Sequence, residues 1–241
     1  MEGRTERLSN WLGKLVDDQG AAEGQSRLSV IGFSLQAEAQ DARAITRELR
    51  QSACTQWRRL DGDVGSSKGI YLWFWPGVSG SQPWPLYVGK SQRGRSCFRS
   101  RTTTHLAHAE RGVDSLYDWE KSIHQGVLVP SHCATSPTCP ETHAKKLRDY
   151  FDGMRVLTLP MDTREAEELA SDAEALMLAA ALKLHGATNP SDTNDDAWKK
   201  ITNSRGRTSS MSSLSPILDE TAKALTYLMN VPPPRQALMA R

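Results

Sequence analysis

The sequence has no long hydrophobic run. Its longest uninterrupted apolar stretch, Ala175–Leu182, has eight residues, whereas a membrane-spanning helix needs about 20. The first eleven residues, MEGRTERLSNW, also have no apolar segment of the kind found in a signal peptide. We therefore expect a protein that does not associate with membranes and that is located in the cytoplasm.

Cysteine is scarce as well. Four cysteines among 241 residues exclude a disulfide-dense scaffold, and we expect reduced thiols. Cys133 and Cys139 stand close to His132 and His143, which raises the question of a zinc site. The spacing lacks the paired cysteines, two to four residues apart, that are typical of structural zinc. A proline-rich loop is therefore the favoured interpretation of this segment.

The chain carries little excess charge. Its net charge is +2, from 30 basic and 28 acidic residues, so the overall balance indicates no particular partner. The distribution is more informative, because one short segment has five basic residues and no acidic one: Lys90, Arg93, Arg95, Arg99 and Arg101. Such a block suits a phosphate-bearing partner such as nucleic acid. A solvated basic loop is the alternative.

Hydrophobic residues make up 38% of the chain, which excludes a wholly disordered protein. Three segments are expected along it: an N-terminal helical extension (1–67), a mixed core (68–190) with an insertion at about 112–150, and a C-terminal linker and helix (191–241). The first segment is assigned as helical because apolar residues such as Leu8, Leu12 and Leu15 recur at intervals of three or four.

Short runs of aromatic and β-branched residues in the core predict strands. The expected strands are 68–75 (KGIYLWFW), 86–89 (LYVG) and 155–159 (RVLTL), and the expected helices of the core are 96–111, 141–151 and 163–185. The first two strands, joined by a loop rich in Pro, Gly and Ser, favour an antiparallel hairpin. The predicted fold class is α/β of the α+β type, a small three-stranded antiparallel sheet flanked by helices.

An ordered set of polar and aromatic residues lies on these elements. The first strand carries Gly69-Ile70-Tyr71, and the second carries Tyr87-Val88-Gly89. Further along the chain come Arg101 and His105, one helical turn apart, then Glu174 and Asn189. In this order, over roughly residues 68–190, the chain resembles the GIY-YIG nuclease family. Half-buried strand tyrosines and a solvated helix face are the structural alternative for the same residues.

The resemblance implies cleavage of DNA phosphodiester bonds with one Mg²⁺ ion, for which Mn²⁺ can substitute. Tyr71 is expected to act as the general base or to orient the attacking water. Since a free tyrosine has a pKa of about 10, a base role needs positive charge nearby. Tyr87 is expected to hydrogen-bond water or phosphate. Arg101 is expected to hold a phosphate oxygen through two N–H groups, and His105 to take a proton from Tyr71 or fix its hydroxyl.

The resemblance also implies a metal ligand. Glu174 is expected to hold Mg²⁺, with water molecules completing its octahedron, and Asn189 to position the helix of Glu174 or to hold the strand ends. Glu167 and Glu168 are rival carboxylates on the same predicted helix.

A chain of this size, with one catalytic core and built-in insertions, is similar to restriction-type members of the family. We therefore expect a sequence-specific DNA endonuclease, and a palindromic target would favour a homodimer. A mobile-element, toxin or repair nuclease is the second interpretation. A catalytically silent nucleic-acid-binding module and a structural protein with accidental matches are the other two.

Overall fold

The structure is a computed structural model. It describes residues 3–17, 28–33, 35, 41–59, 64–77, 80–92, 94, 96–131, 140–204, 211 and 214–231, with only the backbone described at 58, 59, 64, 163 and 165.

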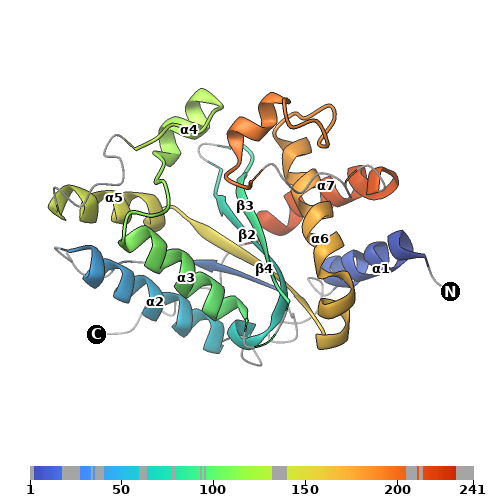
Figure 1. The fold of residues 1–241 in the computed structure, drawn as a ribbon, viewed down its shortest axis with the longest axis horizontal. Helices are drawn as coiled ribbons and strands as arrows, with labels where there is room; N and C mark the ends of the chain where they lie inside the picture. Colours follow the sequence, from blue (N-terminus) through green and yellow to red (C-terminus); the bar gives the residue numbers. More distant parts are fainter. Residues whose placement is uncertain are drawn as a thin grey trace.

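Four antiparallel strands form one sheet in the order β1-β4-β2-β3 (Figure 1). Their bounds are β1 Ser29–Gly32, β2 Lys68–Trp75, β3 Trp84–Ser91 and β4 Arg155–Met161. The α+β class predicted from the sequence is confirmed, but the prediction of three strands is wrong. The additional strand, β1, comes from the segment expected to be entirely helical and pairs with β4. A four-residue strand is too short to show the alternation that reveals longer ones.

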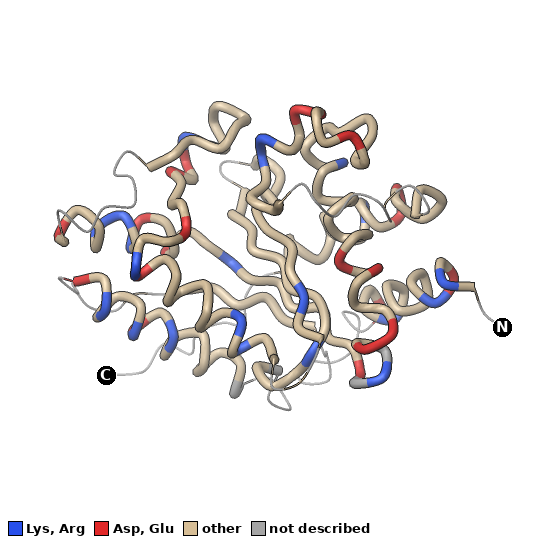
Figure 2. Tube along the Cα trace, in the orientation of Figure 1, with Lys and Arg blue, Asp and Glu red and all other residues tan. Residues whose placement is uncertain are grey.

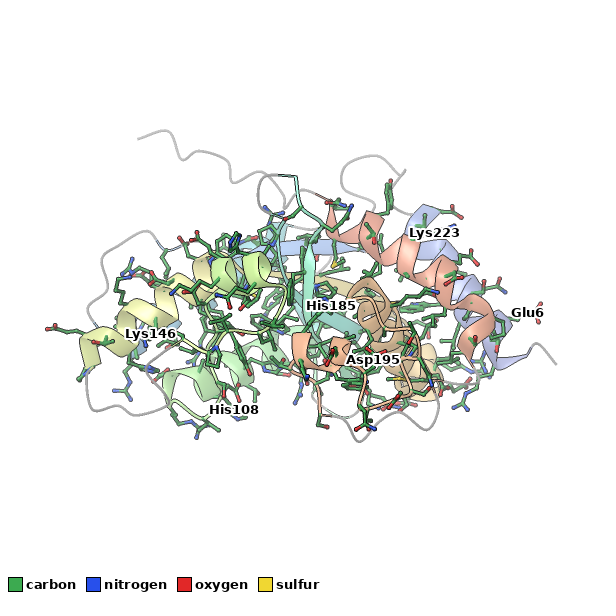
Figure 3. The ribbon with its side chains drawn as sticks, turned by 90° about the horizontal axis from the view of Figure 1, so that it is seen from above. Glu6, His108, Lys146, His185, Asp195 and Lys223 are labelled. Carbon is green, nitrogen blue, oxygen red and sulfur yellow. The ribbon has the colours of Figure 1, made fainter. Side chains whose placement is uncertain are left out.

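Helices cover both faces of this sheet. On one side lie α2 (Ala42–Arg59), α3 (Phe98–Glu110) and α5 (Pro140–Asp152), and on the other lie α1 (Arg4–Asp17), α6 (Thr163–Leu184) and α7 (Ser215–Met229) (Figure 1). Lys146 of α5 and Lys223 of α7 mark the two sides in the view from above (Figure 3). A short helix α4 (Trp119–Gln125) and a 3-10 helix η3 (Asp196–Lys200) lie near one end of β3 (Figure 1), and a further 3-10 helix, η2 (Val64–Ser66), precedes β2.

The two faces carry separate hydrophobic cores because side chains alternate along each strand. Ile70, Leu72 and Phe74 of β2 point toward α6, whose Ala- and Leu-rich middle turns are buried. Tyr71, Trp73 and Trp75 point the other way, toward α2, α3 and α5. A helix that is apolar around most of its circumference must be covered on several sides, and α6 lies between the sheet and the pair α1 and α7.

Charged residues are kept off the strands, with the exceptions Lys68, Lys90 and Arg155. Figure 2 shows Lys and Arg along the outer helices α2 and α3 and acidic residues along α6. Among the described helices, none has the length and apolar character needed to cross a membrane.

Candidate active site

The hydroxyl of Tyr71 is the centre of a polar cluster on the α3 side of the sheet. Arg101 donates its Nε–H to this hydroxyl at 3.1 Å, and Nε2 of His105 lies 3.2 Å from the same oxygen. Both partners project from α3, one turn apart, which is the geometry expected of residues i and i+4. The structure therefore brings together three of the residues singled out in the sequence.

The protonation state of this cluster follows from its hydrogen bonds. An arginine N–H can only donate, so the Tyr71 oxygen accepts from Arg101, and with the His105 proton on Nδ1 the phenolic hydrogen is directed to Nε2. Burial raises the pKa of Tyr71 well above its ordinary value, with Tyr87 adding to the effect and Arg101 opposing it. Burial, followed by the charge of Arg101, lowers the pKa of His105 to about 4. At neutral pH the phenol is therefore protonated and the imidazole is neutral.

Two glycines of the motif make this arrangement sterically possible. A Cβ atom on Gly89 would lie 2.4 Å from both Cζ and the hydroxyl oxygen of Tyr71, so the absence of a side chain there leaves the space that the phenol occupies. Gly69 has φ of 137°, a conformation that strongly favours glycine, and a Cβ there would lie 2.2 Å from the carbonyl oxygen of Leu159. Both glycines therefore have packing reasons independent of any family pattern.

Tyr87 reaches the cluster by the regular alternation of β3, and a bulge in β3 brings Leu86 to the same face of the sheet. Trp73 pairs with Tyr87, whereas Phe74 pairs with Pro85, which leaves Leu86 without a partner in β2. The extra residue shifts the alternation, so Leu86 and Tyr87 both contribute to the core on the α3 side. The ring of Tyr87 lies 5.1 Å from that of His105 and 6.1 Å from that of Tyr71, measured between centroids.

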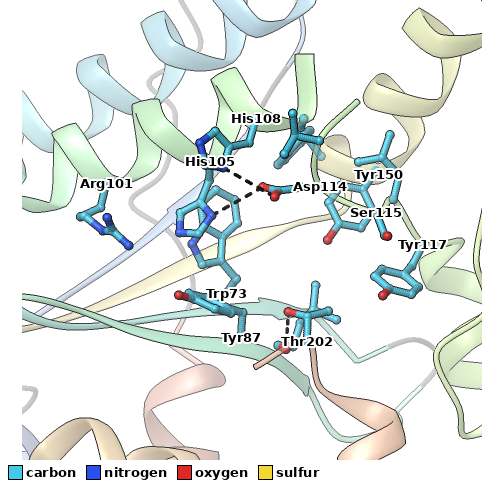
Figure 4. A pocket seen from close by; sticks show the side chains of 15 residues that line it. Trp73, Tyr87, Arg101, His105, His108, Asp114, Ser115, Tyr117, Tyr150 and Thr202 are labelled. Atoms are coloured by element: carbon cyan, nitrogen blue, oxygen red, sulfur yellow. Dashed lines mark hydrogen bonds and ion pairs between the residues drawn. The ribbon is translucent and has the colours of Figure 1, made fainter. Parts of the chain in front are cut away.

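A cavity of about 460 Å³ opens beside the cluster (Figure 4). Tyr87, Arg101 and His105 line it at one end, while Tyr71 lies behind them and is 1% exposed. The rest of the wall is formed by Trp73, Leu86, His108, Ala109, Val113, Asp114, Ser115, Leu116, Tyr117, Tyr150, Phe151 and Thr202. Six of these twelve residues belong to the predicted insertion at about 112–150.

Glu174 lies on the opposite side of the sheet. Its carboxylate is 5% exposed, and its Oε2 lies 3.3 Å from Nζ of Lys90, which also donates to Ser171 Oγ at 2.6 Å. Lys90 follows Gly89 in the edge strand β3 and points toward α6. The Lys90–Glu174 pair and the Tyr71 cluster are therefore separated by one edge strand and approach the same edge of the sheet from its two faces.

The rival carboxylates on α6 lie in other surroundings. Glu168 is held by Arg7 at 2.5 Å and by Arg164 at 3.0 Å, and Glu167 is exposed. Glu174 is thus the carboxylate of the three that is buried beside β3.

A single buried carboxylate can hold a hard divalent ion, because Mg²⁺ takes one or two carboxylates and keeps several water molecules, but here the Lys90 ammonium occupies the carboxylate and would have to move away. The described residues include no group of three His, Cys, Asp or Glu side chains arranged to hold a metal. Glu174 therefore fits a site with one carboxylate ligand and does not fit a fully protein-ligated one.

Asn189 is not joined to this cluster by its described contacts. It is exposed, and its Oδ1 accepts from the backbone N–H of Ser191. The amide that holds a strand is that of Asn203, whose Oδ1 accepts from the Val88 N–H at 2.9 Å while its Nδ2 donates to the Val88 carbonyl at 2.7 Å. Thr202 donates its backbone N–H to Leu86 at 2.8 Å. The sequence contained no signal for these contacts, because Asn203 lies in a polar stretch far from β3 in the chain.

Some of the other expected site residues lie among the described residues and some do not. Arg99 is half-buried on α3, whereas Arg93 and Arg95 lie outside the described residues. Of the four residues considered for zinc, His132, Cys133 and Cys139 also lie outside them, and His143 donates from Nε2 to the carbonyl of Glu110 at 3.1 Å.

Comparisons with protein-family models, curated proteins and solved structures found no match to this chain.

Proposed function

We propose that this chain is a divalent-metal-dependent DNA endonuclease of the GIY-YIG type, acting as a sequence-specific restriction-type enzyme. The observation that carries the proposal is the convergence of Arg101 and His105 on the hydroxyl of Tyr71, with Tyr87 beside them. Arg101 and His105 come from one helix and Tyr71 from a strand, so their meeting depends on the tertiary fold. A polar cluster bordering a cavity is the usual location of a catalytic site.

Phosphodiester hydrolysis needs a water molecule that loses a proton as its oxygen bonds to phosphorus. In the proposed step the water proton moves to the Tyr71 oxygen while the phenolic proton moves to His105 Nε2. The bond from phosphorus to the leaving oxygen breaks, and that oxygen takes a proton from solvent. This relay replaces a free phenolate, which the raised pKa of Tyr71 disfavours, by a protonated His105. The Arg101 charge contributes to the low pKa of His105, so movement of Arg101 to the phosphate would make this protonation easier.

Arg101 and Tyr87 would position the phosphate. A guanidinium offers several N–H donors in one plane and can bridge two phosphate oxygens. Because Arg101 now donates to Tyr71, engagement of a phosphate by Arg101 would draw it away and expose the Tyr71 oxygen. Glu174 would hold Mg²⁺ or Mn²⁺, which supplies charge stabilisation for the phosphoryl oxygens. Lys90, now paired with Glu174, would be released toward the DNA backbone.

A catalytically silent DNA-binding module is the second candidate. The observations that favour it are the burial of Tyr71, which is 1% exposed, and the pairing of Glu174 with Lys90 on the other face of the sheet. Such a module would keep the basic residues and bind DNA without cutting it.

Cleavage of supercoiled plasmid, with Mg²⁺ or with EDTA, separates the two candidates. We expect discrete Mg²⁺-dependent fragments, with the rate falling by about 10²-fold or more in Tyr71→Phe and Glu174→Gln. Tyr227→Phe is the matched control, since this tyrosine lies on α7 and is 55% exposed. Nicking or smearing would favour a toxin, mobile-element or repair nuclease. Retarded but uncut DNA would favour the silent module.

A further inference from the structure

The cavity beside the Tyr71 cluster has two chemically different ends. Arg101 and Tyr87 border it at one end and Tyr117 and Tyr150 at the other (Figure 4). The apolar Trp73 and the carboxylate of Asp114, which lies beside His105 and His108, are between them (Figure 4). Its volume of about 460 Å³ lies within the range of about 300–1,000 Å³ typical of small-molecule sites. A nucleotide is complementary to these two ends, because its anionic phosphate would face Arg101 and its flat polar base would face the aromatic end.

The far wall of the cavity is held by backbone hydrogen bonds. Asp118 donates its N–H to Val129 at 3.0 Å, and Ser131 donates to Leu116 at 3.0 Å, so the segment before α4 pairs with the segment after it. Leu128 N–H reaches the carbonyl of Lys199 at 3.4 Å. Tyr117 is thus presented by a paired segment, and a fixed half-buried ring is a stacking platform for a base.

The carboxylate of Asp114, which lines the cavity, can accept hydrogen bonds from a ligand. Its side chain is 43% exposed, and its oxygens lie 3.6 Å from His108 Nδ1 and 4.0 Å from His105 Nδ1. Both separations exceed a hydrogen bond, and Asp114 makes no hydrogen bond to any described residue. Burial raises the pKa of the neighbouring Tyr150, and Tyr117 and Asp114 add to this effect. The partly exposed carboxylate therefore lies beside histidine and tyrosine rings, and its oxygens have lone pairs that can accept N–H groups from a ligand.

A carboxylate distinguishes among bases by their hydrogen-bonding edges. Guanine presents two adjacent N–H donors, N1–H and N2–H, which match the two oxygens of a carboxylate. Adenine and cytosine present an amino group beside a ring acceptor, and thymine presents one N–H between two carbonyls. A carboxylate would therefore prefer guanine.

The geometry points to a guanine-binding site in this cavity, which takes a base rotated out of DNA beside the phosphate engaged by Arg101. The inference rests on the proposed nuclease function, because it places the phosphate at Arg101. An intact duplex cannot insert a base edge into a concave pocket, whereas a base turned out of the stack can enter and stack on aromatic side chains.

Binding of the four 5′-deoxymononucleotides, dGMP, dCMP, dAMP and TMP, tests the pocket directly. Titration calorimetry in EDTA removes any contribution from cleavage. We expect dGMP to bind about tenfold more tightly than the others, with Asp114→Asn abolishing this preference and Tyr117→Leu weakening all four. Glu120→Gln is the control, since it removes an exposed carboxylate on the adjacent α4. Circular dichroism establishes that each variant is folded.

Duplexes carrying one unpaired guanine, one unpaired thymine or no unpaired base then test whether the base comes from DNA. An unpaired base costs less to turn out, so the unpaired guanine should bind most tightly, in a manner that depends on Asp114. Binding of dGMP without preference for the unpaired guanine would overturn extrusion from DNA and assign the pocket to a free nucleotide. Absence of any guanine preference would overturn the proposal that the cavity is a guanine-binding site.

The plasmid assay on the same preparations keeps the two proposals apart. Cleavage without guanine preference would support the nuclease function and contradict the guanine-binding site. Guanine preference without cleavage would leave the pocket and favour the silent module.

Discussion

Gly89 connects the backbone of β3 with the chemistry proposed for Tyr71. The Tyr71 ring lies against the backbone of this residue, at a distance that no side chain permits. The same phenol is held by Arg101 and His105, so its position is determined on three sides. A small displacement of a reacting group can cost about 10²-fold in rate, which makes Gly89 a sensitive test of the site.

The substitution Gly89→Ala should displace the Tyr71 ring. We expect cleavage to fall by about 10²-fold and the free energy of unfolding to fall by about 1–3 kcal/mol because of overpacking. Urea unfolding and plasmid cleavage measure the two effects. Gly13→Ala is the control, because it lies on the exposed side of α1 with nothing within 4 Å of the added Cβ, and it should be neutral or stabilising. Full activity in Gly89→Ala would contradict the role given to the Tyr71 position.

At the scale of elements, the edge strand β3 is the part of the fold on which both halves of the site depend. Tyr87 projects from it toward α3, and Lys90 projects toward α6. An edge strand has one unpaired side, and here residues 202–203 cover part of that side through Leu86 and Val88. The side-chain amide of Asn203 takes the place of a neighbouring strand at one residue.

Replacement of Asn203 should loosen this edge. In Asn203→Ala the N–H and carbonyl of Val88 lose their side-chain partner, and we expect a loss of about 2 kcal/mol of stability together with reduced cleavage. Asn189→Ala is the matched control, and for this exposed residue we expect a change of about 0.5 kcal/mol or less. Denaturant unfolding of both variants decides between the two asparagines. A larger effect at position 189 would restore the strand-holding role expected there from the sequence.

At the scale of the whole molecule, each face of the sheet contains a histidine that is neutral at pH 7. His105 faces the α3 side, and His185, near the centre of Figure 3, donates from Nε2 to the carbonyl of Pro85 at 2.6 Å. Burial lowers the pKa of each to about 4, below the value of 6.5 for the unfolded chain. As the pH falls, the unfolded chain takes up protons first. The stability is therefore full above about pH 6.5 and is lost as the pH falls toward 4.

Unfolding at two pH values should measure this loss of stability. Between pH 7.5 and 5.0 each histidine should reduce the free energy of unfolding by about 2 kcal/mol. His185→Gln keeps an N–H donor for Pro85 but does not titrate, so its loss of stability over this range should be smaller by about 2 kcal/mol. Urea unfolding at the two pH values provides the comparison. Equal losses in the variant and the parent chain would show that His185 does not titrate between these limits.

The sequence by itself determined the longer strands and helices and the part of the site that lies on α3. The strands β2 and β4 and the helices α3 and α6 were predictable because periodicity and β-branched or aromatic content are local properties. Arg101 and His105 were placed on one helical face by their spacing alone. Gly69 and Gly89 were noted in the sequence only as parts of the motif, and their steric role became visible in the structure.

Only the tertiary structure decided the rest, because the remaining features depend on contacts between residues far apart in the chain. No local pattern reveals the pairing partners that produce the strand β1 and the bulge at Leu86. The same is true of the two hydrogen bonds between Asn203 and the backbone of Val88. The face on which Glu174 lies depends on how α6 packs against the sheet. The cavity wall, from Asp114 to Tyr117, depends on backbone pairing across α4. Long-range pairing and packing therefore shape the site, whereas local sequence supplies its chemical groups.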